Sequence, residues 1–323
     1  MPYNLRSNAP GSHRAGNRIM GTQFRQLVRQ ISVRTASVGL AASLGMVACA
    51  TPRIAQVSVA ETDLHLKSVL GLDTCRDALA RGASGDAPGL DPGSIRLTNW
   101  NVEKKADPSW RSDLDRLSPG ADLILLQEAS LREDTINELD ATLFWSFAPG
   151  YRSNEQVSGV MTLSNVNPVT RCSLVSMEPF LRTPKATNIT QFSLKGRDET
   201  LVVVNMHAVN FSFGLRSFKE QFEEVRQSLA RHDGPVVLSG DLNTWRAGRQ
   251  AVVDELAEDL GLVAINFDED YRVSRFGRQL DHILVRGLQP VNATTYDVST
   301  SDHNPMSVDL RFPSRTLALT AAE

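Results

Sequence analysis

Short apolar runs rich in β-branched residues recur along this chain between polar segments, and they predict buried strands. The predicted strands cover 95–100, 122–126, 159–163, 189–194, 201–205, 235–238, 280–285 and 306–310. Phe218, Phe222, Val225 and Leu229 recur at helical spacing and predict a core-facing helix over 218–229. Further helices are predicted at 110–117, 131–143 and 250–260. The periodicity by itself indicates an α/β or α+β fold.

Eight polar side chains nearly all lie at, or within two residues of, the ends of predicted strands. They supply four carboxylates, two imidazoles and two carboxamides, from Asn101, Glu128, His207, Asp241, Asn243, Asp281, Asp302 and His303. The ends of neighbouring strands can converge in one cleft of an α/β protein. This combination of groups suits the binding of a hard divalent cation and the cleavage of a phosphate ester.

Each of these residues taken alone also fits a purely structural role. Asp241 and Asn243 lie two residues apart after a strand, so their side chains share a face, but an Asx turn would place them there as well. Glu128 could cap a helix, and His207 could be a hydrogen-bonded core histidine. Catalysis is favoured only if the whole set meets in space.

Charge is distributed unevenly along the 323 residues, of which 41% are hydrophobic and 22% charged, an ordinary globular composition. Residues 1–50 contain six Arg and no Lys, Asp or Glu, whereas the remainder has 28 basic and 37 acidic residues. No basic run marks a strong electrostatic footprint for nucleic acid. The composition therefore counts against a processive DNA-binding protein. It does not exclude a phosphate-ester hydrolase, whose positive charge can be local or carried by a metal.

The first 50 residues are predicted to be an export signal or a lipoprotein signal. A basic segment, 25–34, precedes a small and apolar run, 36–48, that is too short for a comfortable membrane span. Ala48-Cys49-Ala50 fits a cleavage site, while Met46-Val47-Ala48-Cys49 resembles a loose lipoprotein box that would attach Cys49 to a membrane. We expect a protein of the bacterial periplasm or cell envelope, secreted or lipid-anchored.

The domain organisation follows from turn-rich segments and cysteine positions. Residues 51–93 are predicted to be an extension and linker, 94–313 the main domain, and 314–323 a disordered tail. Cys75 and Cys172 are the cysteines that remain after Cys49, an even number in a chain bound for an oxidising compartment. We expect them to form a disulfide, with two unrelated buried thiols as the alternative.

Six short motifs occur in series along the chain: Trp100-Asn101-Val102, Gln127-Glu128, Asn205-Met206-His207, Gly240-Asp241-Leu242-Asn243, Leu280-Asp281-His282-Ile283-Leu284 and Ser301-Asp302-His303-Asn304-Pro305. In this order they resemble the endonuclease/exonuclease/phosphatase, or DNase I-like, family. The segment 159–164, with Pro184-Lys185-Ala186 downstream, is similar to a small bacterial branch of uncertain substrate. The resemblance implies an α/β four-layer sandwich of two packed β-sheets flanked by helices.

The family resemblance first implies a metal site. Glu128 is the leading candidate ligand, because magnesium keeps most of its waters and takes one or two carboxylates. Asp302 is the second candidate carboxylate, and Asn101 would hold Asp241 or join the metal shell. The expected ion is magnesium, or manganese, with calcium as a further possibility.

The catalytic groups are assigned on the same basis. His303 would activate water or steady the phosphate, with Asp281 fixing its tautomer as in a triad. Asp241 and Asn243 would position the attacking water and a phosphoryl oxygen. The resemblance implies that His207 is a general acid for the leaving group, so a bell-shaped pH profile is expected.

These expectations combine into an exported, divalent-metal-dependent phosphoesterase, a phosphodiesterase or nuclease that uses water as the nucleophile. A phospholipid or sphingomyelin headgroup or a smaller phosphate monoester stays open as substrate, and a non-catalytic binding module is the alternative from another class. The protein is expected to be a monomer. Phe211 and Phe213 follow His207 in a loop; exposed, they could stack a base or enter lipid, but we expect them to pack beneath the loop.

Overall fold

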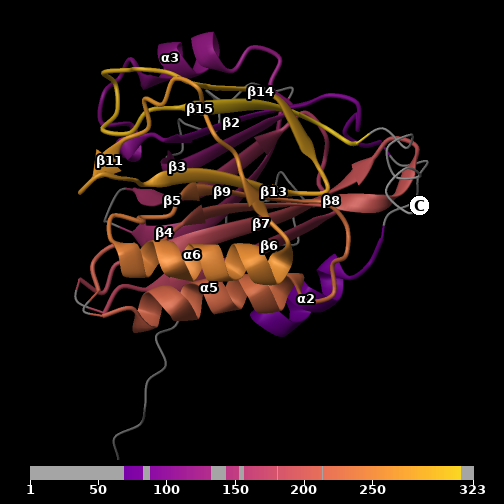
Figure 1. Cartoon of the computed structure of the whole chain (residues 1–323), viewed down its shortest axis with the longest axis horizontal. Coiled ribbons are helices and arrows are strands. Elements are labelled where there is room, and N and C mark those ends of the chain that lie inside the picture. Colours follow the sequence, from indigo (N-terminus) through magenta and orange to yellow (C-terminus); the bar gives the residue numbers. More distant parts are fainter. Residues whose placement is uncertain are drawn as a thin grey trace, which may run out of the picture. The chain divides into compact units, whose positions relative to one another are not determined.

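Two β-sheets pack face to face and helices cover their outer faces in the computed structural model of this protein (Figure 1). The structure describes residues 69–82, 88–131, 143–152, 156–179, 181–212 and 214–313. The predicted export segment, Cys49 and the predicted tail at 314–323 lie outside these residues. Within the described residues, no helix is long and apolar enough to cross a membrane.

Each sheet mixes parallel and antiparallel strands. The seven-stranded sheet has, in spatial order, β1 (Val69–Leu70), β6 (Thr170–Met177), β7 (Pro184–Leu194), β8 (Arg197–His207), β9 (Val236–Asp241), β13 (Asp281–Arg286) and β10 (Val263–Ala264). The six-stranded sheet has β14 (Gln289–Thr295), β15 (Met306–Arg311), β2 (Ile95–Asn101), β3 (Leu123–Leu131), β5 (Val157–Ser164) and β4 (Phe144–Arg152). A small hairpin, β11 (Ser274–Arg275) and β12 (Arg278–Gln279), forms a separate two-stranded sheet.

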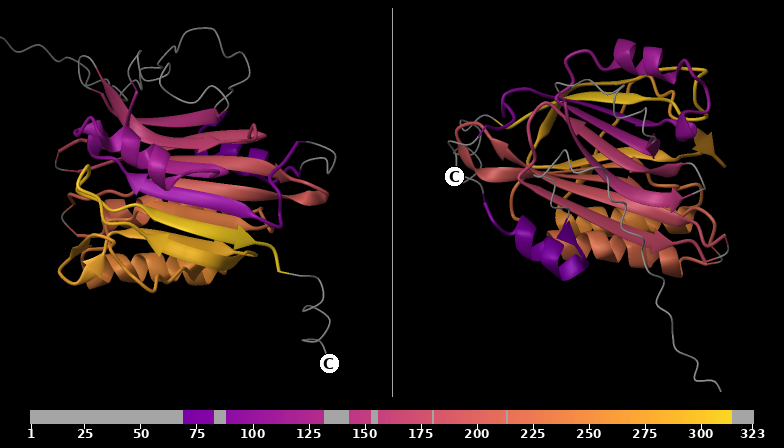
Figure 2. Two further views of the ribbon diagram at one scale, coloured as in Figure 1. Left: turned by 90° about the horizontal axis from the view of Figure 1, so that it is seen from above. Right: turned by 180° about the vertical axis from the view of Figure 1, so that it is seen from behind.

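The helices lie on opposite sides of the paired sheets (Figure 2). Helices α2 (Leu72–Leu79), α5 (Arg216–Leu229) and α6 (Ala247–Leu260) pack on the seven-stranded sheet, and α3 (Trp110–Leu117) packs on the six-stranded sheet. Between the sheets a third apolar cluster joins the inner faces of both. The described chain therefore has the four layers expected from the family resemblance, and the fold-class prediction is confirmed.

The two-residue period of the strands decides which side chains enter the gap between the sheets. In β8, Val202 and Val204 pack toward the helices, whereas Leu201 and Val203 pack between the sheets. The same alternation carried to the end of β8 places His207 in the gap. Successive strands therefore deliver their last inward residue to one end of the sandwich.

Strand pairing brings three of these end residues into register. His207 pairs with Asp241 between the parallel strands β8 and β9, and Asp241 pairs with Asp281 between the antiparallel strands β9 and β13. Gly240 has φ of 146°, and a Cβ there would come within 1.9 Å of the Met206 carbonyl oxygen. Glycine is therefore required where β8 and β9 pack this closely.

The helix predicted at 131–143 is tested only at its two end residues and otherwise stays a prediction. Strand β3 continues through Glu128 to Leu131, and β4 begins at Phe144. Residues 132–142 lie outside the described residues. Strand β3 carries an irregularity between Leu126 and Ala129, which shifts its inward positions by one residue.

Ordered structure begins before Ser94, because β1 pairs with β6 and α2 packs against α5 and the outer face of the seven-stranded sheet. Cys75 of α2 and Cys172 of β6 form a disulfide with a Cα–Cα distance of 5.8 Å. The predicted disulfide is confirmed, and it ties a segment interpreted as an extension to the body of the fold.

Candidate active site

A buried cluster of two carboxylates and one imidazole lies at the end of β9 and β13. The His303 Nδ1–H donates to Asp281 Oδ2 over 2.7 Å, and His303 Nε2 lies 3.9 Å from Asp241 Oδ2. One ligand atom from each of the three residues lies within 4.8 Å of the others, so the group could hold a metal ion. The indole N–H of Trp100 donates to the His303 carbonyl oxygen over 2.9 Å and fixes the turn that presents the imidazole.

The charges of this cluster are strongly coupled. Burial alone would lower the pKa of His303, but the negative charges of Asp281 and Asp241 outweigh it and raise that pKa to about 10. Burial raises the pKa of Asp241 to about 6, although the positive charge of His303 opposes the rise. At neutral pH His303 is therefore an imidazolium held between two carboxylates. Such a group can donate hydrogen bonds but cannot accept a proton from water.

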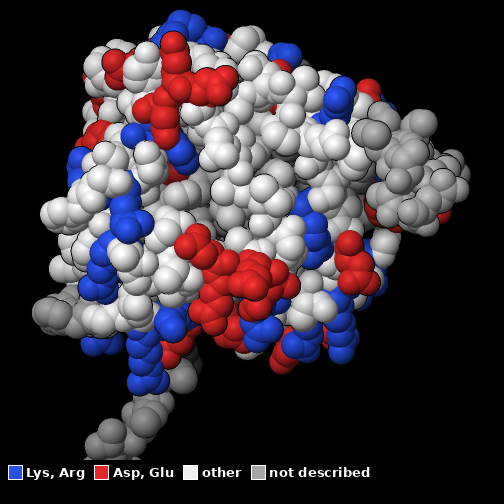
Figure 3. Space-filling view, viewed as in Figure 1, with Lys and Arg blue, Asp and Glu red and all other residues white. Residues whose placement is uncertain are grey.

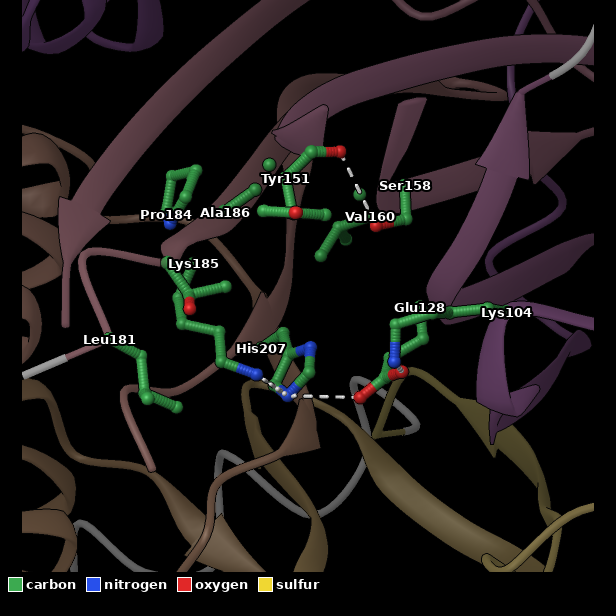
Figure 4. A pocket seen from close by; sticks show the side chains of 13 residues that line it. Lys104, Glu128, Tyr151, Ser158, Val160, Leu181, Pro184, Lys185, Ala186 and His207 are labelled. Atoms are coloured by element: carbon green, nitrogen blue, oxygen red, sulfur yellow. Dashed lines mark hydrogen bonds and ion pairs between the residues drawn. The ribbon is translucent and has the colours of Figure 1, made fainter. Parts of the chain in front are cut away.

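A second imidazole, His207, joins this cluster to the other sheet. Its Nε2 lies 3.4 Å from Asp241 Oδ2 and 3.8 Å from Glu128 Oε1. Lys185 Nζ lies 2.8 Å from the same nitrogen, and Lys104 forms an ion pair with Glu128 (Figure 4). His207 is thus the residue through which Glu128 and the buried acidic cluster meet.

His207 is uncharged at neutral pH. Burial lowers its pKa well below the ordinary value of 6.5, and the positive charges of Lys185 and His303 lower it further. The Lys185 ammonium therefore donates to an unprotonated Nε2. A neutral imidazole has no extra proton to give, so the predicted general-acid role of His207 requires Lys185 beside it.

Glu128 reaches the site because β3 is irregular at that point. Its φ of 52° is rare for a residue other than glycine, and it lies within the register shift between Leu126 and Ala129. The preceding Gln127 is buried between the sheets, where its amide donates to Asn99 over 2.9 Å and to Asn205 over 2.6 Å. These bonds anchor the strand before it turns Glu128 toward His207.

The two predicted amides are both gathered around Asp241. Asn101 donates to Asp241 Oδ2 over 3.2 Å, while its own Oδ1 accepts the backbone N–H of Glu103 over 3.1 Å. The backbone N–H of Asn243 donates to Asp241 Oδ1 over 3.1 Å, and its side chain donates to the Ala208 carbonyl oxygen over 3.1 Å. The φ of 51° at Asn243 is tolerated by asparagine and permits this turn.

Asp302 is the predicted site residue that the structure does not bring into the buried cluster. Its side chain is exposed, and its backbone N–H donates to Glu103 Oε2 over 3.2 Å. The reason is local, because the Ser301 hydroxyl accepts the His303 backbone N–H and directs His303 inward. The side chain of the residue between them points outward.

The donor set fits a hard divalent cation. Carboxylate and carboxamide oxygens are the ligands that magnesium, manganese and calcium take. Among the described residues, the buried Oδ1 of Asp281 has no hydrogen-bond partner, which is unusual for a carboxylate at 1% exposure. Asn101 adds an oxygen beside Asp241, and Glu128 adds a carboxylate beside His207, which itself adjoins Asp241.

A cavity of about 380 Å³ opens directly from Glu128 and His207. Its walls come from β4, β5 and the start of β7, and Lys104, Lys185, Tyr151 and Leu181 face it (Figure 4). The volume lies within the range of small-ligand pockets. A phosphate held at the cluster could therefore carry an attached group into this space.

Three residues outside the predicted set contact predicted site residues, namely Glu103, Lys104 and Lys185. Glu103 and Lys104 have φ of 45° and 56°, an uncommon backbone that helical or strand patterns do not reveal. The signal for Lys185 was present, since a lysine follows a proline in a motif already noted. Nothing in its spacing indicated that its ammonium would meet His207.

Comparison with known proteins gives consistent results. A UPF0294 protein of Vibrio vulnificus (strain CMCP6) is 37% identical over 226 residues, which cover 69% of this chain and 78% of that protein. A UPF0294 protein of Photorhabdus laumondii subsp. laumondii is 37% identical over 216 residues, covering 67% of this chain and 83% of that protein.

Solved structures share the fold at low sequence identity. An endonuclease/exonuclease/phosphatase family protein from Leptotrichia buccalis aligns with a TM-score of 0.52 at 16% identity, covering 68% of this chain and 100% of that chain. The human Nocturnin catalytic domain with bound sulfate aligns with a TM-score of 0.53 at 16% identity, covering 70% and 97%. The family model described as Endonuclease/Exonuclease/phosphatase family matches residues 98–303, more than half of the chain. The chain therefore belongs to the endonuclease/exonuclease/phosphatase family.

Proposed function

We propose that this protein is a divalent-metal-dependent phosphodiesterase in which water attacks phosphorus and a P–O bond breaks. The observation that carries the proposal is the meeting of Asp241 with His303, His207 and Asn101 at one end of the sandwich, with Glu128 beside His207. Membership of a family of phosphoester hydrolases supports it, as does the sulfate in the related Nocturnin structure, an anion with the shape of phosphate.

Each residue of the buried cluster has its own role in the proposed reaction. Asp241 is ionised at neutral pH, since its pKa is about 6, and it orients the attacking water and accepts its proton. The His303 imidazolium, oriented by Asp281, donates to a phosphoryl oxygen as negative charge builds up on it. The chemistry supplied by a bound magnesium or manganese ion, held by Glu128 and Asn101, is polarisation of the P–O bond.

The leaving oxygen needs a proton, and we assign its delivery to the Lys185–His207 pair. The ammonium lies 2.8 Å from the imidazole Nε2, and both side chains line the cavity. A proton shared within the pair is available where the alcohol group departs.

The experiment that tests this function is hydrolysis of bis(p-nitrophenyl) phosphate, p-nitrophenyl phosphate, plasmid DNA and sphingomyelin in parallel, with magnesium, manganese or EDTA. We expect metal-dependent cleavage of phosphodiesters that His303→Ala abolishes. Activity that survives EDTA would contradict the metal requirement, and full activity of His303→Ala would contradict the assigned site. No hydrolysis of any substrate, together with no magnesium-dependent shift in melting temperature, would favour a binding module.

We also propose that the protein is exported and acts as a monomer in the cell envelope. Lipid attachment at Cys49 would hold it to a membrane. The Cys75–Cys172 disulfide supports export, because disulfides persist in oxidising compartments such as the periplasm. Fractionation of cells that express the full chain, with a Cys49→Ala variant beside it, tests export and membrane attachment, and gel filtration of the purified protein tests the monomer. Recovery of the wild-type protein with its cysteines reduced in the cytoplasm would contradict export.

A further inference from the structure

The hairpin β11–β12 carries an aromatic ring where its turn disfavours one. Phe276 and Gly277 form a two-residue loop between Arg275 and Arg278, and both loop residues have positive φ, 52° and 75°. Positive φ at both positions defines the type I′ turn, in which Asn or Asp normally precedes Gly. Phenylalanine strains this backbone, and here its side chain is 88% exposed as well. Neither the geometry of the turn nor packing in the core therefore accounts for a phenylalanine at position 276.

The hairpin stands directly beside the active-site strands. Gln279 ends β12, and its carbonyl oxygen accepts a hydrogen bond from the Thr244 hydroxyl, which follows Asn243. Two residues after Gln279, Asp281 begins β13 and holds His303. A ligand that extends from the catalytic cluster along these strands would reach the hairpin.

A second aromatic side chain adjoins Phe276. The Trp245 and Phe276 ring centroids are 6.1 Å apart, and the two planes are tilted by 55°. Trp245 donates its indole N–H to Asn210 Oδ1 over 3.0 Å, which fixes its position next to the loop that carries Phe211. Phe211 is 58% exposed and does not pack beneath that loop, contrary to expectation, while Phe213 lies outside the described residues.

The charged groups on this hairpin are cations. Among the described residues, no carboxylate forms an ion pair with Arg275 or Arg278, and the Arg246 guanidinium lies 4.9 Å from the centre of the Trp245 ring. Figure 3 shows Lys and Arg along the side of the molecule where β11 lies in Figure 1, whereas Asp and Glu gather over α6. The hairpin itself therefore carries positive charge, while the nearby Asp270 accepts a hydrogen bond from Gln279 over 3.3 Å and pairs with Arg272.

We propose that the aromatic and basic patch formed by Trp245, Arg246, Arg275, Phe276 and Arg278 binds single-stranded nucleic acid, with a base stacked on Phe276 and neighbouring phosphates on the arginines. This inference rests on the proposed function, since it names the substrate class of that site. Free ring faces next to unpaired cations are what strand binding without sequence preference uses. A lipid surface fits less well, because three arginines, Arg246, Arg275 and Arg278, stand among the aromatic rings of the patch.

The variant Phe276→Asn separates binding from folding. Asparagine suits the type I′ turn, so we expect its melting temperature to rise by about 2–4 °C while affinity for a single strand falls by about 5-fold to 100-fold. Binding is measured by fluorescence anisotropy with a labelled phosphorothioate octanucleotide in the presence of magnesium. Phe144→Asn is the matched control, because Phe144 is also exposed but lies at the end of β4 that pairs with Ser164, far along the strand from the cavity.

Two further measurements complete the test. Arg275→Gln and Arg278→Gln should each reduce the slope of log affinity against log salt by about 0.7, the contribution of one single-strand phosphate contact. Hydrolysis of bis(p-nitrophenyl) phosphate should be unchanged in the control Phe144→Asn, since Phe144 lies at the other end of β4 from the cavity. If the wild type binds the oligonucleotide through Phe276 but hydrolyses no substrate, the phosphodiesterase function is contradicted and the binding of single-stranded nucleic acid by the patch is supported.

The proposal is overturned if Phe276→Asn binds the octanucleotide as tightly as the wild type, or loses no more than Phe144→Asn does. It is also overturned if the wild type ignores the octanucleotide and instead binds vesicles of anionic phosphatidylglycerol in a Phe276-dependent way. Vesicles of phosphatidylcholine serve as the neutral control in that arm.

Discussion

The Asp281 carboxylate determines the state of His303 more than any other group near it. It accepts the Nδ1–H over 2.7 Å, fixes the tautomer, and contributes the largest of the electrostatic effects that raise the His303 pKa to about 10. Because Asp281 is 1% exposed, water screens this interaction little. The working form of the imidazole therefore depends on a residue that need not touch the substrate.

We expect Asp281→Asn to lower kcat for a chromogenic phosphodiester by about 10³-fold to 10⁴-fold with little change in KM, since an amide neither holds the tautomer nor favours the imidazolium. Activity of the wild type is lost as pH rises through the pKa of His303. Without the Asp281 charge that pKa falls, so the alkaline limb of the pH profile should move to lower pH. Steady-state kinetics from pH 6 to 10 measure both effects.

Asp302→Asn is the comparison for this variant, because it alters the exposed carboxylate next to His303. A far smaller loss is expected for Asp302→Asn. Equal losses in the two variants would show that the exposed Asp302 contributes as much as the buried Asp281, contrary to the geometry.

Site residues at strand ends were predictable from the sequence, whereas their partners Glu103, Lys104 and Lys185 were not. His207, Asp241 and Asp281 were predicted because each lies at, or within two residues of, the end of a predicted strand. The charged state of His207 was missed, since it depends on the ammonium of Lys185, which is contributed by another strand. Local patterns do not report such pairings.

At the scale of elements, the same limit applies to edges and irregular strands. Helices over 110–117 and 250–260 were predicted within a few residues, because apolar side chains repeat at helical spacing. Strand β4 was missed, since Pro149 and Gly150 within it indicate a turn and its side chains are only partly buried. The family resemblance predicted two packed sheets flanked by helices but no order of strands within each sheet, because local sequence patterns do not show which distant segments pair.

Helix α2 illustrates an element that depends on a covalent link. It has eight residues, too few for a stable isolated helix, and it packs on the sheet beside α5. We expect Cys75→Ala combined with Cys172→Ala to lower the free energy of unfolding by about 2–4 kcal/mol, because the disulfide closes a loop of 97 residues and restricts the unfolded chain. Urea unfolding followed by circular dichroism measures the change.

The wild type in reducing agent is the control for the disulfide variant, and its midpoint should move toward that of the double variant. An unchanged midpoint in the double variant would show that packing alone holds α2. Retained phosphodiesterase activity is expected in either case, since neither cysteine lies near the catalytic cluster in the sheet order.

At the scale of the whole described molecule, polar groups buried between the sheets connect the core to the site. Asn99, Gln127, Asn205 and Ser239 come from four strands of the two sheets and hydrogen-bond to one another at 2.6 to 2.9 Å. Such a network is costly unless every member is satisfied, so it favours one relative placement of the sheets. That placement in turn sets Glu128 of one sheet against His207 of the other.

Stability of the molecule should also depend on pH through a histidine far from catalysis. His232 lies between α5 and β9, where its Nε2–H donates to the Pro235 carbonyl oxygen over 3.1 Å. Burial lowers its pKa below the ordinary 6.5, and the nearby positive charge of Arg286 lowers it further. The unfolded chain therefore binds a proton at this position more readily than the folded chain does.

The sign of the effect follows from this difference. Above about pH 6.5 His232 is neutral in both states, but as pH falls below that value the unfolded state takes up a proton first and the folded state loses stability. We expect His232→Gln, whose amide can still donate to Pro235, to reduce the fall in melting temperature between pH 7.5 and 5.5. Differential scanning calorimetry of both proteins measures it, and parallel curves for the two proteins would show that His232 does not take part in the loss of stability.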